Sequence, residues 1–319
     1  MSRDTSVAVS VEIGGERTTV ALIDQQGRVR HRCHAKTLRG RPATATLEPY
    51  LRSIDTMLVF AREQGWPVQG IGMSLPGSLE QTTRRPLTVS LLPSLNNFPL
   101  QDLLESRYHL PAHLNSDVDA AMLGEQCFGA GRGFRRLLFL TVSAVVGAAF
   151  VVDGQFERST QYVGHVCHLS VTASGPRCSC GKRGCINTLV STDALQKMVQ
   201  RAVRRGDETS LTRRLLNREY FSPQLLAEEA ARGDSVSLQI YGEVGRWLGA
   251  AVNKYVDLFE PHVLILGGGG VLYAADLVLS QVRSTLGGQS SARVCSMVEV
   301  VPACLGRDAA LVGAAVPLL

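Results

Sequence analysis

The chain is poor in charge and in aromatic residues, and it lacks a long apolar run. Of its 319 residues, 19% are charged, 6% are aromatic and 45% are hydrophobic. That balance excludes an intrinsically disordered chain. The longest apolar stretch, Leu137 to Val152, is interrupted by Thr141, Ser143 and Gly147. It falls short of the roughly 18 uninterrupted residues that a membrane helix needs, so we interpret it as two buried strands.

A signal peptide and a concentrated basic patch are also missing. Residues Met1 to Ser6 are polar and lead directly into a strand-like run, so we expect a cytoplasmic protein without membrane contact. The net charge of +5 is modest, and the arginines are scattered apart from Arg201, Arg204 and Arg205. Nucleic-acid-binding proteins usually concentrate positive charge on one face. We interpret the basic excess as a solvated surface and expect no direct nucleic-acid binding.

The 8 cysteines do not suggest disulfides. In a reducing compartment, a tight cluster of cysteines is more typical of a metal site. Five cysteines are dispersed and are interpreted as small buried apolar residues: Cys33, Cys127, Cys167, Cys295 and Cys304.

The remaining three cysteines crowd into one short segment. They are Cys178, Cys180 and Cys185, and His168 lies just upstream. Three thiolates and one imidazole are good zinc ligands and complete a tetrahedral structural site. The sequence therefore predicts structural zinc bound by these four residues; the alternative is a group of buried thiols.

Strand-like and helical patterns alternate through both halves of the chain. Strands are predicted at Val7–Ile13, Thr18–Ile23, Arg28–Ala35, Val68–Leu75, Ala112–Asn115, Leu137–Val142, Gly147–Val152, Val263–Leu266 and Val298–Pro302. Helices are predicted at Leu47–Gln64, Leu100–Tyr108, Asp119–Phe128, Ser191–Arg204, Ser210–Leu216, Pro223–Arg232, Ser235–Val256 and Asp308–Leu318. This order indicates an α/β protein. Asp117, Gly14, Gly15 and the glycines from Gly267 follow strands, where catalytic groups of such folds lie.

The segment from Gly164 to His168, followed by Cys178 to Cys185, resembles the zinc motif of the ROK family of bacterial sugar kinases and sugar-responsive repressors. The resemblance extends over nearly the whole chain, through Glu12–Gly15, Leu75–Gly77, Ser116–Glu125, Leu258–Pro261, Gly267–Gly269, Leu305–Ala309 and Gly313–Ala315. It implies the actin-like ATPase fold, with two α/β domains and a cleft between them. We expect domains at 1–117, completed by the C-terminal helix 305–319, and at 118–304.

The same resemblance implies roles for particular residues. Asp117 stands at the position of the catalytic base that takes a proton from the sugar hydroxyl. Nucleotide contacts, to ATP with Mg, are implied for Gly14, Gly15, Ser143, Gly267, Gly268 and Gly269. Sugar contacts are implied for His165, His168 and Asn187, and Asn96 or Asn97 would supply the amide that the family carries nearby. The resemblance also implies a homodimer or tetramer.

Several positions depart from the family's kinase pattern. Glu16 replaces a threonine, and its carboxylate would repel phosphate. The second phosphate loop, usually Gly-Thr-Gly, begins here at Ser143 and carries Val145, whose branched side chain stiffens the turn. His165 and Asn187 replace two glutamates that grip sugar hydroxyls, which is expected to change or abolish hexose recognition. In the first phosphate loop, Glu12 replaces the aspartate of the family kinases, which is a mild change.

Three hypotheses remain open. The chain is an active sugar kinase of unusual specificity, a non-catalytic member that binds a sugar or related small molecule, or a sugar-responsive regulator that lacks its own DNA-binding domain. The altered contact positions occur together, so we favour the non-catalytic hypothesis. Asp117 has a simpler alternative role as an acidic residue at a helix N-terminus.

Overall fold

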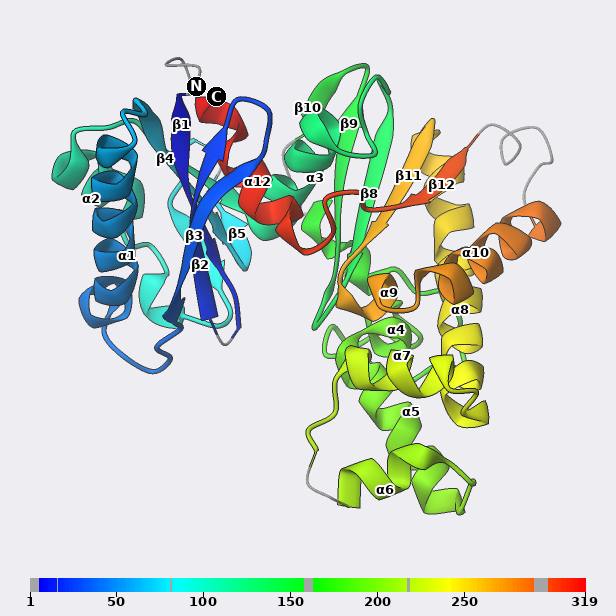
Figure 1. Cartoon of the computed structure of the whole chain (residues 1–319). Helices are drawn as coiled ribbons and strands as arrows, with labels where there is room; N and C mark the ends of the chain where they lie inside the picture. The colour runs from blue at the N-terminus through cyan, green and yellow to red at the C-terminus, as the bar shows by residue number, and fades with distance from the viewer. Residues whose placement is uncertain (1–5, 16, 81, 158–162, 217–218, 290–297) are drawn as a thin grey trace. The chain divides into compact units, whose positions relative to one another are not determined.

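The computed structural model describes residues 6–15, 17–80, 82–157, 163–216, 219–289 and 298–319 (Figure 1). The chain divides into two compact units. The first comprises residues 1–133, 156–162 and 307–319, and the second comprises residues 134–155 and 163–306. Within the described ranges, no helix is both long and apolar enough to cross a membrane.

The first unit is built on a five-stranded sheet of order β3-β2-β1-β4-β7. Its strands are β1 (Val7–Ile13), β2 (Arg17–Asp24), β3 (Val29–Lys36), β4 (Val68–Leu75) and β7 (Ala112–Ser116). β1, β2 and β3 form an antiparallel meander, whereas β4 and β7 continue the sheet parallel to β1. Three strands therefore end at the same edge, and this edge carries Glu12 and leads into Asp117.

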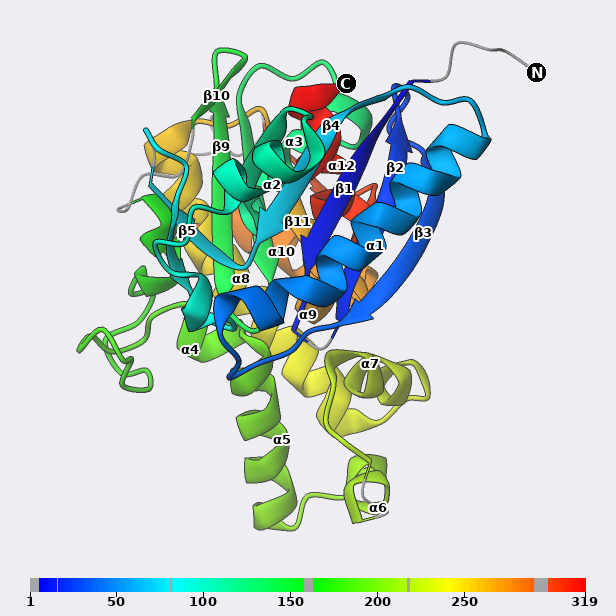
Figure 2. The same ribbon diagram turned by 90° about the vertical axis from the view of Figure 1, so that its left-hand side faces the viewer.

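Helices cover both faces of this sheet. α1 (Ala43–Glu63) packs on β1, β2 and β3, as Figure 2 shows, and buries Leu47, Tyr50, Ile54 and Met57 at helical spacing. On the other face lies α12 (Ala309–Ala315), which contacts β1 and β4. A short helix α2 (Leu100–Tyr108) and a hairpin of β5 (Gly77–Leu79) and β6 (Pro86–Val89), followed by η1 (Pro93–Leu95), complete the unit.

α3 (Asp117–Phe128) belongs to the first unit, whereas the sequence analysis assigned the residues after Asp117 to the second domain. The physical reason is close packing against the C-terminal helix. A Cβ atom on Gly313 of α12 would lie 1.6 Å from the carbonyl oxygen of Ala120 in α3. The two helices touch backbone to backbone, so the first unit extends to Gly133.

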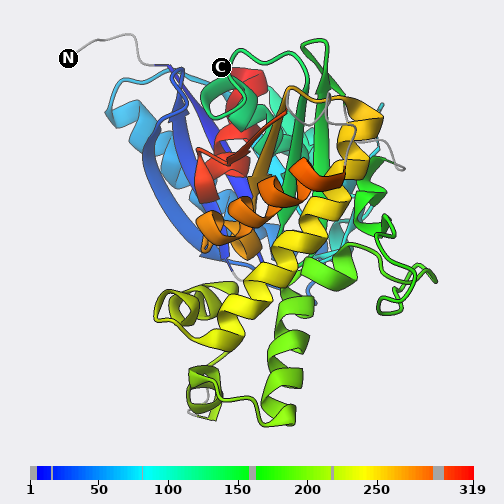
Figure 3. The ribbon, with the colours of Figure 1, turned by 90° about the vertical axis from the view of Figure 1, so that its right-hand side faces the viewer.

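The second unit repeats the sheet topology with the order β10-β9-β8-β11-β12. Its strands are β8 (Leu137–Val142), β9 (Val146–Val152), β10 (Gln155–Glu157), β11 (Val263–Gly267) and β12 (Glu299–Pro302). As in the first sheet, the first long strand pairs antiparallel with its successor and parallel with a later strand. The long helices α8 (Ser235–Phe259, gold) and α10 (Ala275–Gln289, orange) pack side by side in Figure 3.

The remaining helices of the second unit are short or lie beside α8. They are η2 (Val163–His168), α4 (Asn187–Val190), α5 (Thr192–Arg205), α6 (Ser210–Leu216), α7 (Pro223–Ala231) and α9 (Gly269–Leu272). The turn η3 (Gly306–Asp308) connects to α12, and η4 (Val316–Leu318) follows it. One contiguous core joins the buried side of β8, β9 and β11 to α5, α7, α8 and α10.

Candidate ligand and metal sites

Glu12 and Asp117 lie at one edge of the first sheet. The register pairs Glu12 of β1 with Ser74 of β4, and Ser74 with Asn115 of β7, two residues before Asp117. Asp117 is the first residue of α3, and its Oδ1 accepts a hydrogen bond from the Val118 amide at 2.9 Å. Asp117 therefore lies at a helix N-terminus, where an acidic side chain interacts favourably with the helix dipole. It also lies beside the candidate first phosphate loop.

Both carboxyl groups hold their protons more tightly than usual. Burial raises the pKa of Glu12 to about 7, and the charges of Asp117 and Asp308 raise it further, against the opposing effect of Arg307 and Arg17. Burial likewise raises the pKa of Asp117 to about 6, although the hydrogen bond from Val118 opposes the shift. Carboxyl groups that titrate near neutral pH and share one site are typical of functional sites.

A polar pocket of about 510 Å³ opens beside Glu12. Polar residues from β2, β3 and η3 line it: Arg17, Arg32, His34, Arg307 and Asp308. Arg32 and Asp308 form a two-bond ion pair, with distances of 3.0 Å from Nη1 to Oδ1 and 2.7 Å from Nη2 to Oδ2. The scattered arginines were expected to form a solvated surface, so this pocket was not predicted from the sequence. The available signal was the alternation of Arg32 and His34 on a predicted strand.

The candidate first phosphate loop turns tightly between β1 and β2. The Gly14 amide donates to the Arg17 carbonyl at 3.1 Å, and a Cβ atom on Gly14 would lie 2.6 Å from that oxygen. The Thr37 hydroxyl donates to the Gly14 carbonyl, and the Arg39 guanidinium donates to the Gly15 carbonyl. Glu16, whose carboxylate was expected to repel phosphate, lies outside the described residues.

The candidate second phosphate loop joins β8 to β9, and its own groups bind one another. The Ser143 amide and hydroxyl both donate to the Val145 carbonyl, each at 3.3 Å. The next amide, of Val146, donates to Oδ1 of Asn187 at 2.9 Å. The side chain of Val145 is 54% exposed at the tip of the turn. Two amides and one hydroxyl of this loop therefore already have partners within the protein.

The candidate adenosine-side glycines follow β11. Gly268 has a φ of +84°, and a Cβ atom there would lie 2.3 Å from the Val142 carbonyl at the end of β8. Glycine is therefore required at this position for the backbone conformation and for the close approach of two chain segments. Gly267 ends β11 and Gly269 begins α9.

The candidate sugar residues lie in both units. Asn96 and Asn97 are exposed residues after η1 in the first unit; Oδ1 of Asn96 accepts the Val89 amide at 2.8 Å, and Asn97 has a φ of +58°. In the second unit, Asn187 begins α4, and His165 lies in η2, where its side chain is outside the described set. The amide oxygens of Asn96 and Asn187 thus hold backbone in place.

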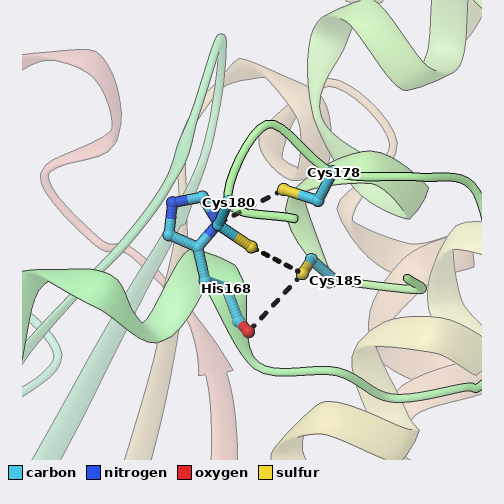
Figure 4. A group of neighbouring side chains, drawn as sticks. All are labelled: His168, Cys178, Cys180 and Cys185. Atoms are coloured by element: carbon cyan, nitrogen blue, oxygen red, sulfur yellow. Dashed lines mark hydrogen bonds between the residues drawn. The ribbon is translucent and has the colours of Figure 1, made fainter. Parts of the chain in front are cut away.

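The four predicted metal ligands come together in the second unit (Figure 4). The side-chain donor atoms of His168, Cys178, Cys180 and Cys185 all lie within 4.8 Å of one another. Nδ1 of His168 is 3.3 Å from Sγ of Cys178, and the sulfurs of Cys180 and Cys185 are 3.6 Å apart. A tetrahedral zinc site has donor separations of about 3.5 Å for nitrogen to sulfur and about 3.8 Å between sulfurs.

The thiols of the loop are shifted in opposite directions: burial and the side chains of Cys180 and Cys178 raise the pKa of Cys185. Although burial opposes ionisation, hydrogen bonds from the Cys180 backbone and from the Cys180 and His168 side chains lower the pKa of Cys178 to about 6. Gly184 has a φ of +61°, and a Cβ atom there would lie 1.8 Å from the Thr172 carbonyl. The loop is therefore tightly folded around the donor set, which matches a closed structural metal site in ligand type and number.

Both units have the same sheet topology, and this duplication is typical of the actin-like ATPase fold. The first unit carries carboxylates where its strands end, and the second unit carries a Cys/His cluster. A model of the ROK family matches residues 8–318, and the chain belongs to this family. Family members include both kinases and repressors, so membership alone does not assign an activity.

Individual relatives come from both branches. The chain is 28% identical over 311 residues to a glucokinase of Thermotoga maritima, covering 96% of this chain and 95% of the relative. It is 25% identical over 293 residues to a xylose repressor of Caldicellulosiruptor bescii, covering 91% and 72% of the two chains.

Solved structures agree on the fold. A ROK family glucokinase from Streptomyces griseus, in complex with glucose and AMPPNP, superposes with a TM-score of 0.79 at 26% identity and covers 97% of this chain and 98% of its own. A ROK family transcriptional regulator, a homologue of the E. coli MLC protein, gives a TM-score of 0.86 at 23% identity, with coverage of 97% and 77%. The second likeness supports the fold alone.

Proposed function

We propose that this chain is a ROK family sugar-binding protein in which ATP-dependent phosphoryl transfer is weak or lost. One observation carries the proposal: the loop between β8 and β9 binds its own polar groups instead of presenting them. The Ser143 hydroxyl is directed to the Val145 carbonyl, and the Val146 amide is taken by Asn187. Phosphoryl transfer depends almost entirely on positioned donors around the phosphates, so such a loop supplies little of what the reaction needs.

The small-molecule ligand proposed is a sugar. The relatives named above are glucokinases and a xylose repressor, and one solved relative contains glucose. The metal proposed is zinc, because three thiols and one imidazole are a typical structural zinc set. It would stabilise the loop that leads from His168 to Asn187. A zinc ion with four protein ligands has no open position for water or substrate, so the zinc would have no direct role in catalysis.

Calorimetric titration with ATP and magnesium tests the proposal. We expect no measurable heat of binding for the wild-type chain. In the triple variant Ser143→Gly, Ala144→Thr, Val145→Gly, which restores the usual family loop, we expect a measurable heat of binding. The ATP affinity of the variant should lie at least tenfold, about 1.4 kcal/mol, above the detection limit that the wild type does not reach. Micromolar ATP binding by the wild type would refute the proposal, and thermal denaturation of both proteins would control for intact folding.

An active sugar kinase of unusual specificity is the second candidate. It is favoured by Asp117, whose pKa of about 6 suits a general base near neutral pH. It is also favoured by Gly268, whose positive φ maintains the family's adenosine-side turn. If this candidate is right, some hexose or amino sugar is phosphorylated, and Asp117→Asn abolishes the reaction.

A further inference from the structure

The three cysteines of the candidate metal site differ in their access to solvent. Cys178 and Cys185 are 6% and 0% exposed, whereas Cys180 is an exposed residue. A dissolved oxidant therefore reaches the sulfur of Cys180 before it reaches the other two. Cysteines that respond to oxidants are typically accessible and have a second cysteine close by.

Cys185 is the cysteine best placed to react with an oxidised Cys180. Their sulfurs are 3.6 Å apart, as Figure 4 shows, whereas Sγ of Cys178 lies 3.3 Å from Nδ1 of His168. A disulfide brings its sulfurs to about 2.05 Å, so one side of the pair must move. A Cβ atom on Gly181 would meet nothing within 4 Å, which leaves room beside Cys180 for this movement.

The segment that follows Cys185 holds the loop between β8 and β9. α4 begins two residues later at Asn187, whose Oδ1 accepts the Val146 amide at 2.9 Å. Just beyond α4, the Thr192 amide donates to the Ser143 carbonyl at 2.8 Å. A change at Cys185 therefore reaches both sides of the β8–β9 loop through these two hydrogen bonds.

We propose that Cys180 is a site of reversible oxidation by peroxides, which joins Cys180 to Cys185 in a disulfide and releases the zinc. First, the Cys180 thiolate attacks one oxygen of hydrogen peroxide; the O–O bond breaks, a sulfenic acid forms and hydroxide leaves. The Cys185 thiolate then attacks the sulfenic sulfur; the S–S bond forms, the S–O bond breaks and a second hydroxide leaves. The two sulfurs lose two electrons in total, and the peroxide gains them.

The consequence is a loop that responds to oxidants. Only His168 and Cys178 remain as metal donors, and a structural zinc site needs four. Without the ion, the segment that leads to Asn187 is less constrained, and its hydrogen bond to the Val146 amide weakens. Thiol reductants restore both thiolates and allow zinc to bind again. This inference rests on the zinc of the proposed function and adds a form of regulation to it.

Peroxide titration of the reduced, zinc-loaded full chain tests the inference. The zinc content is measured first, a chromogenic chelator then follows zinc release, and mass spectrometry maps the disulfide. Trypsin cleaves after Lys182 and Arg183, so a disulfide between Cys180 and Cys185 holds two peptides together, and fragmentation distinguishes Cys178 from Cys180. We expect zinc release in step with a Cys180–Cys185 disulfide, and recovery of bound zinc after dithiothreitol and zinc are added.

The variant Cys180→His keeps a zinc ligand and removes the accessible thiol. Two thiols and two imidazoles are also a typical structural zinc set, so we expect this variant to retain zinc. Peroxide should release that zinc at least about tenfold more slowly, because the remaining thiols are buried. Cys127→Ser removes an exposed thiol from α3 and is the matched control, which should release zinc at the wild-type rate. If Cys180→His binds no zinc, the disulfide map of the wild type decides the inference.

Amide hydrogen exchange, followed by NMR, tests the link to the β8–β9 loop. Oxidation should speed exchange of the Val146 amide at least about tenfold, since its acceptor on Asn187 is no longer held in place. The amide of Ile265, in the buried strand β11, should exchange at the same rate before and after oxidation.

Several results would overturn the inference. They are a disulfide that does not include Cys180, zinc retained at peroxide concentrations that oxidise Cys127, zinc loss that dithiothreitol does not reverse, and unchanged exchange at Val146 after zinc release. A reduced chain that neither contains nor takes up zinc would overturn both the inference and the metal of the proposed function. The ATP titration decides the rest of the proposed function and does not depend on the disulfide, so the two can fail separately.

Discussion

At the scale of single residues, Glu12 is the group whose charge the fold controls most clearly. It lies at the end of β1, near two other carboxylates and two arginines. An acid whose pKa is raised in the folded state binds a proton on folding. Its penalty is absent at low pH, develops as pH rises from about 4.5 to about 7, and is constant above that. Glu12 therefore destabilises the folded chain at neutral and alkaline pH.

Replacing this carboxylate should make the chain more stable in a pH-dependent manner. We expect Glu12→Gln to raise the free energy of unfolding by on the order of 1–3 kcal/mol at pH 8 and to approach the wild-type value near pH 4.5. Urea denaturation of both proteins across this pH range measures the difference. Glu48→Gln, at an exposed position of α1, is the control. A gain that is constant with pH would show that Glu12 ionises normally.

The sequence singled out some candidate residues and missed others for a definite reason. Asp117 was singled out because it follows a strand and matches a family motif, and its role as a base stays a prediction. Arg32 was missed because its partner Asp308 lies 276 residues further along the chain. A strand pattern shows that Arg32 and His34 share a face, but it does not show which distant segment covers that face.

At the scale of elements, the loop with the candidate metal ligands, Cys178 to Cys185 (the metal loop), has a tightly constrained backbone. Gly181 and Gly184 both have positive φ, but their surroundings differ. A Cβ atom would meet nothing within 4 Å at Gly181, whereas at Gly184 it would lie 1.8 Å from the Thr172 carbonyl. Substitutions at these two glycines therefore separate the free-energy cost of an unfavourable backbone conformation from the free-energy cost of a steric clash.

This pair gives a matched test. We expect Gly181→Ala to cost about 1 kcal/mol, because alanine only adopts an unfavourable φ. Gly184→Ala should cost roughly 2–5 kcal/mol, because the added methyl group also displaces backbone at Thr172. Thermal denaturation of the zinc-loaded variants measures the two costs. Equal destabilisation would contradict the loop geometry described above.

Metal removal should affect the same element. If zinc holds His168 and the three cysteines together, chelation with EDTA should lower the melting temperature of the second unit by several degrees, because binding energy contributes to folding energy. Differential scanning calorimetry before and after chelation, with metal content measured in each sample, tests this. A metal-free protein that melts at the same temperature would exclude a structural role.

Most elements matched their sequence patterns, and the exceptions have physical causes. α10 was not predicted, although Val278, Val282 and Leu286 recur at helical spacing and are buried. The glycines from Gly267 before this helix, and the polar residues after it, obscured the apolar pattern of the helix in the sequence. The β5–β6 hairpin was missed because its strands are only 3 and 4 residues long. Strands this short carry too few side chains for alternation to be visible.

At the scale of the whole molecule, the chain combines the architecture of its family with a loop at Ser143 whose donors have partners within the protein. Both units keep the same strand topology, and the ROK family model covers residues 8–318. The metal loop brings its four donors together, yet the neighbouring loop at Ser143 binds itself and Asn187. The fold and the grouping of the four candidate metal ligands follow from packing and local spacing, which sequence patterns reveal. Whether the hydrogen-bond donors of a loop are available to a ligand depends on side-chain partners from elsewhere in the chain, such as Asn187 here.

The most direct test of the account is transfer of the γ-phosphate of ATP to a panel of hexoses and amino sugars. The wild-type chain, Asp117→Asn and the loop variant Ser143→Gly, Ala144→Thr, Val145→Gly would be assayed side by side with radiolabelled ATP. The account predicts that the wild type forms little or no more sugar phosphate than Asp117→Asn, while the loop variant forms clearly more. Sugar phosphate produced by the wild type as fast as by the loop variant, and abolished by Asp117→Asn, would contradict it.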